Sequence, residues 1–101
     1  MDQIDRINKY EYILNNSNQI IKNLEKTIND LNNIQSDIKS LNDYYGSSEW
    51  YKDIDDDKLG LLPKDINKGI LSEDAIYNLL MNNKEIAIDM LEVATNILKN
   101  N

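Results

Sequence analysis

The chain has 101 residues, of which 41% are hydrophobic and 29% charged, and its net charge is −7. This length suits one small domain, and the apolar content is too high for a disordered tail. Eleven basic residues are scattered among eighteen acidic ones. Nucleic acids and anionic membrane surfaces require clustered cations, so both are excluded as expected partners.

The residue types that the chain lacks exclude several kinds of chemistry. Without cysteine it has no disulfide and no thiolate nucleophile. Without histidine it lacks the commonest general base and the commonest transition-metal ligand. We therefore expect a protein that is not an enzyme and that uses no metal and no cofactor. Residues 1–5 resemble no signal peptide, and no stretch approaches the roughly 18 apolar residues of a membrane span, so a cytoplasmic location is expected.

Apolar residues at helical spacing predict a first long helix over about residues 3–45. Nearly all gaps in this stripe are three or four residues, which is typical of a helix buried along one face. The stripe consists of Ile4, Ile7, Tyr10, Leu14, Ile21, Leu24, Ile28, Leu31, Ile34, Ile38, Leu41 and Tyr45. Residues 15–18 are weak helix formers, but the stripe keeps its phase across them. We predict one continuous helix, and a break at 15–18 would instead give a three-helix bundle.

Residues 46–71 form a connector that contains all the glycine and proline of the chain. Gly46 is a natural stop for the first helix, and Ser47 or Ser48 is a candidate cap for a short helix. Pro63 is suited to begin a helical turn that Gly69 ends. A connector of this length is expected to have structure or function of its own.

An acidic run at residues 53–57 superficially resembles a calcium-binding loop. Counted from Asp53, the positions that need glycine and glutamate in an EF-hand hold Lys58 and Lys64, which excludes that mode of binding. A weaker divalent-cation site that includes Glu49 is the alternative. We prefer a solvated, charged turn as the interpretation.

The last helix has the clearest start signal in the sequence. Ser72 is the predicted N-cap, and Glu73 and Asp74 lie in the first turn, where the helix dipole favours acidic residues. Helix capping accounts for these carboxylates better than a catalytic pair with Asp53 does. The apolar stripe that follows predicts a helix over residues 72–99, and it consists of Ile76, Leu80, Asn83, Ala87, Met90, Ala94 and Ile97. The predicted fold is all-α, with two long antiparallel helices forming a helical hairpin across a partly helical connector in one domain, 1–101.

Several motifs in the connector resemble a known family. They are Tyr44-Tyr45, Trp50 followed by Asp53, Gly60-x-Leu62-Pro63, and Gly69-Ile70-Leu71-Ser72-Glu73-Asp74-x-Ile76-Tyr77. Together they resemble the small proteins of Gram-positive bacteria grouped as domain of unknown function 4298. The resemblance covers residues 44–77 by motif and the flanking helices by length. It implies a helical architecture and an important connector, and it implies no activity, cofactor or catalytic residue.

The same connector residues are the candidates for a binding surface. Trp and Tyr dominate binding hot spots, so Tyr44, Tyr45, Trp50, Asp53, Leu62 and Pro63 form either an exposed partner-binding patch or the closure of the connector onto the helices. We favour closure, with Trp50 as its plug, because a two-helix domain has little other material for a core.

The N-terminal part of the first helix is predicted to associate with another protein chain. At 1.5 Å per residue the second helix ends opposite roughly residue 17 of the first. Ile4, Ile7, Tyr10 and Leu14 are then left without an intrachain partner. A heptad-like stripe is also typical of an intermolecular coiled coil, although the hairpin's own seam accounts for most of it. A homodimer or a protein partner is favoured over a fold-back of the helix.

These features predict a small cytoplasmic protein with a non-enzymatic interaction or regulatory role. The alternative is a secreted helical hairpin of the Trp-x-Gly type, exported without a signal peptide. Trp50-Tyr51-Lys52 lacks the glycine of that motif, and the connector is too long for its tight turn.

Overall fold

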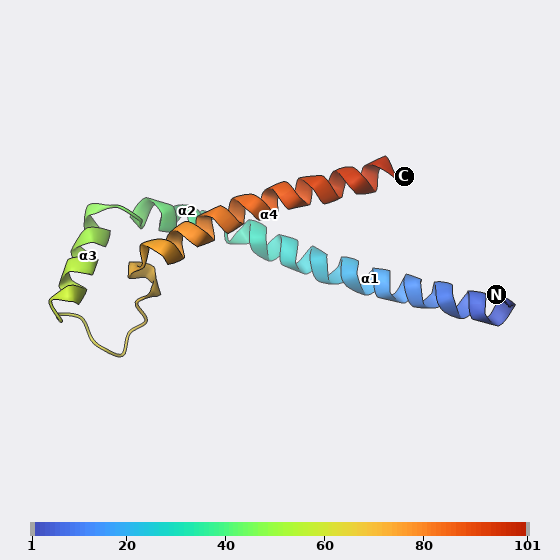
Figure 1. The fold of residues 1–101 in the computed structure, drawn as a ribbon, viewed down its shortest axis with the longest axis horizontal. Coiled ribbons are helices and arrows are strands. Elements are labelled where there is room, and N and C mark those ends of the chain that lie inside the picture. Colours follow the sequence, from blue (N-terminus) through green and yellow to red (C-terminus); the bar gives the residue numbers. More distant parts are fainter. Residues whose placement is uncertain (1, 101) are drawn as a thin grey trace. The chain divides into compact units, whose positions relative to one another are not determined.

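A computed structural model of the chain describes residues 2–100 and consists of helices joined by turns and one loop (Figure 1). The elements in chain order are α1 (Gln3–Asn33), α2 (Gln35–Tyr44), α3 (Ser48–Lys58), the short 3-10 helix η1 (Gly69–Leu71) and α4 (Glu73–Lys99). Because residues 2–100 contain no β-strand, the prediction of an all-α fold is confirmed. The chain divides into two compact units, residues 1–36 and 37–101. That it forms a single domain stays a prediction.

In the first unit, α1 runs for 31 residues without a break. The polar residues at 15–18 are helical, and the side chains around them form contacts along the helix. Asn15 donates to the Glu11 carboxylate at 3.4 Å, and Gln19 donates to the Asn23 side chain at 3.0 Å. Pairs four residues apart support a helix by a few tenths of a kcal/mol, about what asparagine costs it. The alternative of a break at 15–18, with the three-helix bundle built on it, is therefore wrong.

The helix expected over residues 3–45 is instead interrupted at Ile34, between α1 and α2. The Ile34 N–H still donates to the Asp30 carbonyl at 3.0 Å. One residue later, the Gln35 side chain donates to the Leu31 carbonyl at 3.0 Å. In a continuous α-helix that carbonyl accepts from the backbone N–H of residue 35, so the side chain competes with the helix's own hydrogen bond. The prediction of one uninterrupted first helix is corrected on this point.

None of the side chains of α1 is buried. Its apolar stripe is exposed along its length, from 69% at Ile4 through 53% at Leu14 to 43% at Ile28. Most helical stability in proteins comes from packing an amphipathic face, so this helix lacks its main source of stabilisation within its own unit.

In the second unit, a tight turn leads from α2 into α3. Gly46 has a φ of +80°, which a residue without a Cβ adopts at little cost. The Ser47 hydroxyl then accepts from the Trp50 N–H at 3.2 Å as the N-cap of α3. This cap fixes where α3 begins, and with it the direction in which the indole of Trp50 leaves the backbone.

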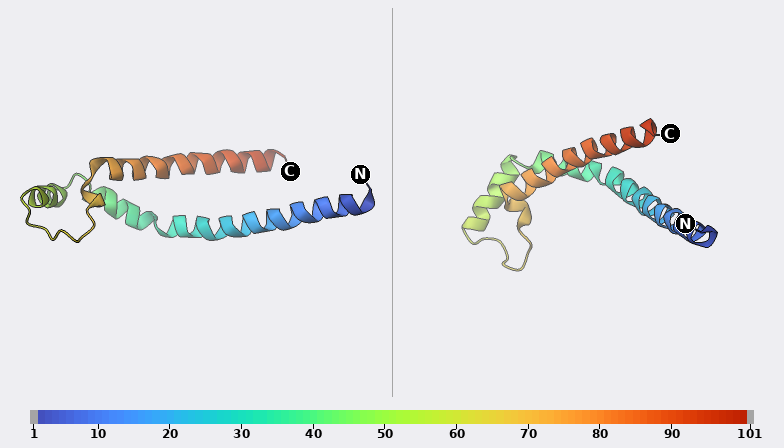
Figure 2. Two further views of the ribbon diagram at one scale, coloured as in Figure 1. Left: turned by 60° about the horizontal axis from the view of Figure 1, so that its bottom comes forward. Right: turned by 45° about the vertical axis from the view of Figure 1, so that its right-hand side comes forward.

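An irregular loop leads from α3 to η1 (Figure 2). Gly60, with a φ of +73°, ends the α3 segment, and Lys68 at the far end of the loop forms an ion pair of 2.7 Å with Asp57. The helical turn expected from Pro63 to Gly69 is wrong, because the only helical turn of this loop begins at Gly69. The ion pair instead ties the loop's end back to α3.

The last helix, α4, begins at Glu73 and runs to Lys99. The Ser72 hydroxyl accepts from the Ala75 N–H at 3.3 Å and caps its N-terminus. Among residues 2–100 the buried apolar side chains are Trp50, 4% exposed, and Ile76, 2% exposed. The core of the second unit thus lies where α3 and the first turn of α4 meet η1.

Candidate interaction site

Trp50 is the centre of a group of aromatic contacts within the second unit. Its indole N–H donates to the Ile70 carbonyl at 3.0 Å, which ties α3 to η1. The rings of Tyr45 and Tyr51 each meet the indole edge-on, with centroids 5.1 Å away. Such pairs add roughly 0.5–1.5 kcal/mol to simple burial. We name this group the aromatic clasp, and it consists of Tyr44, Tyr45, Trp50 and Tyr51 with the acceptors Asp53, Ile70 and Glu73.

Tyr44 joins the end of α2 to α3. Its hydroxyl donates to the Asp53 carboxylate at 2.5 Å. This hydrogen bond, with partial burial and the nearby negative charge, raises the pKa of Tyr44 to about 12. The phenol is therefore a proton donor at any physiological pH, and the carboxylate accepts from it.

Tyr45 joins the end of α2 to the first turn of α4. Its hydroxyl donates to Glu73 over 3.4 Å, near the limit for a hydrogen bond. Burial, followed by the negative charge of Glu73, raises the pKa of Tyr45. Glu73 is thus both a favourable residue for the helix N-terminus and an acceptor in the clasp.

An open hollow of about 450 Å³ lies beside the clasp. Tyr45, Trp50, Tyr51, Ile54 and Leu71 supply its apolar wall, and charged side chains stand at its margin. Tyr51 is 57% exposed, so one face of its ring remains open to solvent. An apolar wall beside a charged margin is suited to contact with a side chain of another protein.

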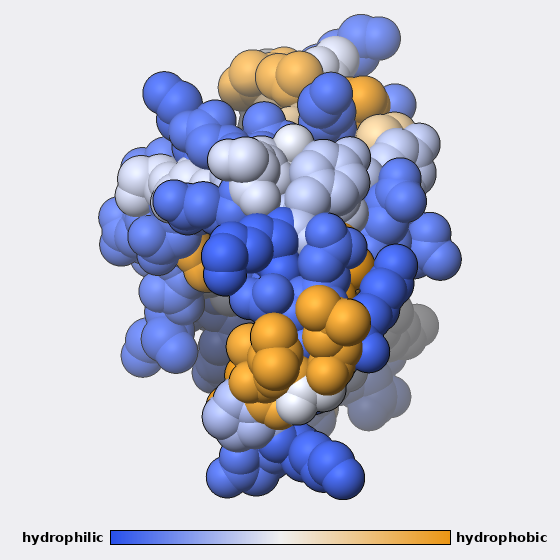
Figure 3. All heavy atoms as spheres, turned by 90° about the vertical axis from the view of Figure 1, so that its left-hand side faces the viewer, coloured by the Kyte–Doolittle hydropathy of each residue, from blue (hydrophilic) through white to orange (hydrophobic). Residues whose placement is uncertain are grey.

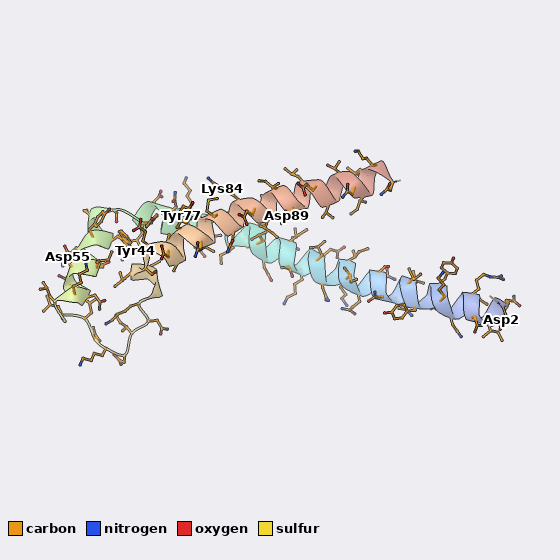
Figure 4. All side chains as sticks on the ribbon, in the orientation of Figure 1. Asp2, Tyr44, Asp55, Tyr77, Lys84 and Asp89 are labelled. Atoms are coloured by element: carbon orange, nitrogen blue, oxygen red, sulfur yellow. The ribbon has the colours of Figure 1, made fainter. Side chains whose placement is uncertain are left out.

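Most of the acidic run is paired with other parts of the second unit. Asp53 accepts from Tyr44, Asp56 forms an ion pair of 2.8 Å with Lys52, and Asp57 pairs with Lys68. Asp55 lies exposed on α3 (Figure 4). Among residues 2–100, acidic side chains do not gather in groups of three or more that could hold a metal ion.

The Leu-Pro turn of the connector does not join the clasp. Leu62 is half-buried and Pro63 exposed, and neither lines the hollow beside Trp50. Their neighbours Leu59 and Leu61 are 72% and 68% exposed. Apolar patches stand among hydrophilic side chains on the side of the molecule that Figure 3 shows.

The four residues predicted to self-associate lie on one exposed face of α1. Ile4, Ile7, Tyr10 and Leu14 are 69%, 53%, 57% and 53% exposed. Arg6, Ile7, Tyr10, Glu11 and Leu14 line a shallow hollow on this face. The clasp and this face belong to different units.

Sequence reasoning missed a second apolar stripe on α4. Each position of this second stripe follows a position of the predicted stripe by one residue, so the two stripes are about 100° apart around the helix axis. Its exposed apolar members are Tyr77, Met81, Ile88, Leu91 and Leu98. Lys84 stands on the same line, where Figure 4 labels it together with Tyr77. Sequence reasoning interpreted Leu91 and Leu98 only as a widening of the first stripe, and it did not connect them with Tyr77, Met81 and Ile88.

None of the helices described in residues 2–100 is both long and apolar enough to cross a lipid bilayer.

Among known protein families, the family model described as Domain of unknown function (DUF4298) matches residues 7–93 of the chain. The chain belongs to this family. No curated protein and no solved structure shows significant similarity to it.

The match to the DUF4298 family includes the clasp, most of α1 and most of α4. The family resemblance expected from the connector motifs is thus confirmed. Those motifs hold every aromatic and acidic residue of the clasp except Tyr51, and the structure brings these residues together in the second unit. The family description assigns no activity, so the site's role must be argued from its geometry.

Proposed function

We propose that this DUF4298 protein is a non-enzymatic protein-interaction module. In this proposal the aromatic clasp fixes the start of α4, and the long helices present apolar stripes to other helices. The observation that carries the proposal is the exposure of the α1 stripe. Ile7, Leu14 and Ile21 are 53%, 53% and 56% exposed, on a continuous helix with no buried side chain. Exposed apolar surface of this extent marks an interaction site in soluble proteins.

The first contact in this proposal is a helical hairpin within the chain. Tyr45 and Glu73 anchor the start of α4 to the end of α2. In this hairpin α4, whose 27 residues span roughly 40 Å at 1.5 Å per residue, would run antiparallel to α2. Its predicted stripe would then cover the apolar residues of α2, Ile38 and Leu41.

The second stripe of α4 supports contact with a further helix. A single neighbouring helix covers a stripe of roughly 100°. Ile88 and Leu91, 56% and 70% exposed, lie beyond that width from the predicted stripe. Fully burying a side chain of this size contributes roughly 1.5–3 kcal/mol of favourable free energy. A partner helix that covers the second stripe would provide this burial.

The polar residues of the site support a structural role over a catalytic one. Asp53 accepts from Tyr44, Glu73 accepts from Tyr45, and the Ser72 hydroxyl caps α4. Asp53, Glu73 and Ser72 thus each have a partner that explains their position. A protein-binding role needs none of them to be free.

Site-specific photo-crosslinking in the source cells tests the proposal. A photoreactive residue at Ile21 or Ile88 should give protein adducts in high yield, since both lie on exposed apolar stripes. The matched control for Ile21 is Lys26, on the opposite side of the same helix. Equal adduct yields from Ile21 and Lys26, with Ile88 no better, would contradict an interaction role for these stripes.

A further inference from the structure

Apolar residues recur along α1 with a period of seven residues. Positions 7, 14, 21 and 28 form one series, and positions 10, 17, 24 and 31 form a second series three residues later. In heptad notation these are the a and d positions of a coiled coil. They hold Ile7, Leu14, Ile21 and Ile28 at a, and Tyr10, Ser17, Leu24 and Leu31 at d. A repeat of seven over four heptads is typical of helices that supercoil around a partner.

The surface of α1 repeats with the same period. One hollow, of about 330 Å³, is lined by Ile7, Tyr10, Glu11 and Leu14, together with Arg6. A second, of about 280 Å³, is lined by the residues fourteen positions later, Ile21, Leu24, Glu25 and Ile28, together with Asn29. Both are formed by residues a, d, e and the following a. Four residues in such an arrangement form the hole that receives a side chain of the facing helix in a coiled coil.

We infer that α1 pairs with α1 of a second copy of this chain in a parallel, in-register two-stranded coiled coil. This rests on the proposed interaction role and names its partner. Isoleucine at a with leucine at d favours two parallel strands. Three of the four a positions hold isoleucine, and the d positions nearest the C-terminus of α1 hold Leu24 and Leu31.

The charges beside the stripe specify the direction of the pair. Arg6 is at g and Glu11 at the following e, and in a parallel dimer g of one helix faces that e of the other. A spacing of five residues does not bring Arg6 and Glu11 together on one helix. Within residues 2–100 neither forms an ion pair. In an antiparallel dimer e faces e, where Glu11 and Glu25 would place like charges near each other.

A second copy fits this face better than the acidic part of the chain does. Residues 2–33 carry five acidic and four basic side chains, whereas residues 34–101 carry thirteen acidic and seven basic. Two copies of α1 can therefore approach with little net repulsion.

Single cysteines in the full chain, which has none of its own, test the register. Ser17→Cys places a thiol at d, where the two copies of residue 17 face each other in a parallel, in-register dimer. Disulfides need Cα atoms about 4.4–6.8 Å apart, so this variant should oxidise to a linked dimer rapidly and nearly completely. Asn16→Cys, one residue away and outside the stripe, is the matched control and should remain largely unlinked. Leu24→Cys, also at d but away from the middle of α1, should link equally well, whereas in an antiparallel dimer its two copies would lie roughly 18 Å apart along the axis. It also repeats the test should Ser17→Cys lose helix content by circular dichroism.

Sedimentation equilibrium at tens of micromolar tests the association itself. The wild-type chain should be dimeric. Arg6→Glu and Glu11→Arg should each weaken the dimer by roughly tenfold, as two repelling pairs replace two attracting ones, and the double variant should recover most of the affinity.

A wild-type chain that sediments as a monomer would overturn the homodimer. Equal oxidation of Ser17→Cys and Asn16→Cys would overturn it as well. So would a charge-swapped double variant whose dimer affinity is no higher than that of either single variant. Photo-crosslinks from Ile21 to other proteins would, in a monomeric chain, leave the proposed interaction role standing. Equal adduct yields from Ile21 and Lys26, with Ile88 no better, would overturn that role, so the two failures are distinguishable.

Discussion

The clasp and α1 are built from similar residues but differ in what holds them. Trp50 and Ile76 are 4% and 2% exposed, whereas α1 has no buried side chain over 31 residues. The clasp joins residues far apart in the chain, such as Tyr45 and Glu73, whereas the hydrogen bonds between α1 side chains span four residues. The clasp is thus stabilised by the fold of its own unit, and α1 depends on whatever covers its stripe.

The largest expected effect is that of breaking the clasp at its centre. Trp50→Ala should lower the free energy of unfolding by about 3–5 kcal/mol, because it leaves a large cavity and removes the donor to the Ile70 carbonyl. Denaturant unfolding followed by far-ultraviolet circular dichroism measures it. Trp50→Phe, which keeps most of the volume, should cost markedly less.

A matched pair of isoleucines is the control for that experiment. Ile76→Ala should lower the free energy of unfolding of the second unit by about 2–5 kcal/mol, since the side chain is 2% exposed. Ile21→Ala, where the isoleucine is 56% exposed, should change the same free energy of unfolding by no more than about 0.5 kcal/mol in dilute solution. Similar losses from both variants would contradict the distinction between the two regions.

The helix caps sharpen the comparison at a smaller scale. Ser72→Ala should cost about 1 kcal/mol, because the Ala75 N–H loses its acceptor, while Ser72→Asp should be nearly neutral. Asp2, whose carboxylate accepts from the Asp5 N–H at 2.8 Å, caps α1 in the same way. Asp2→Ala should reduce helix content and leave the clasp's unfolding midpoint, followed by tryptophan fluorescence, unchanged. Equal damage from Ser72→Ala and Ser72→Asp would count against capping.

The smallest expected effect is a pH dependence that only the clasp should show. The pKa of Tyr44 is about 12 in the folded chain, against about 10 for an unfolded tyrosine. The folded state therefore holds more protons between these values, so the stabilisation is complete below pH 10 and is lost as pH rises through 12. Tyr44→Phe should cost about 0.5 kcal/mol at pH 8, because this hydroxyl is only half-buried.

Unfolding of the wild type and of Tyr44→Phe, compared at pH 8, 10 and 11.5, isolates this contribution from the other titrating groups. The difference between the two proteins should shrink as pH rises. A difference that stays constant to pH 11.5 would show that the hydrogen bond to Asp53 does not govern the ionisation of Tyr44.

Local signals in the sequence predicted much of the fold. The stripes, the glycine at 46 and the serine at 72 act within one or two helical turns, so spacing and residue type were enough to predict an all-α chain. The interruption at Ile34 was missed because the apolar stripe keeps its spacing there, from Leu31 through Ile34 to Ile38. The pairing of Tyr44 with Asp53 and of Tyr45 with Glu73 was also missed. Those contacts depend on how α2, α3 and α4 are placed by the turns between them.

The clasp's hydrogen bonds have a kinetic consequence. The bonds from Tyr44 to Asp53, from Trp50 to Ile70 and from Tyr45 to Glu73 span 9, 20 and 28 residues. The entropy lost on closing a loop grows with the logarithm of its length, by roughly 0.6 kcal/mol per doubling, and the bond from Tyr45 to Glu73 encloses the one from Trp50 to Ile70. Once the inner loop has closed, the outer one has few free residues left to order. We therefore expect the contacts of the clasp nearest α3 to form first and the bond from Tyr45 to Glu73 to form last. This should take microseconds to milliseconds, well before two dilute chains meet.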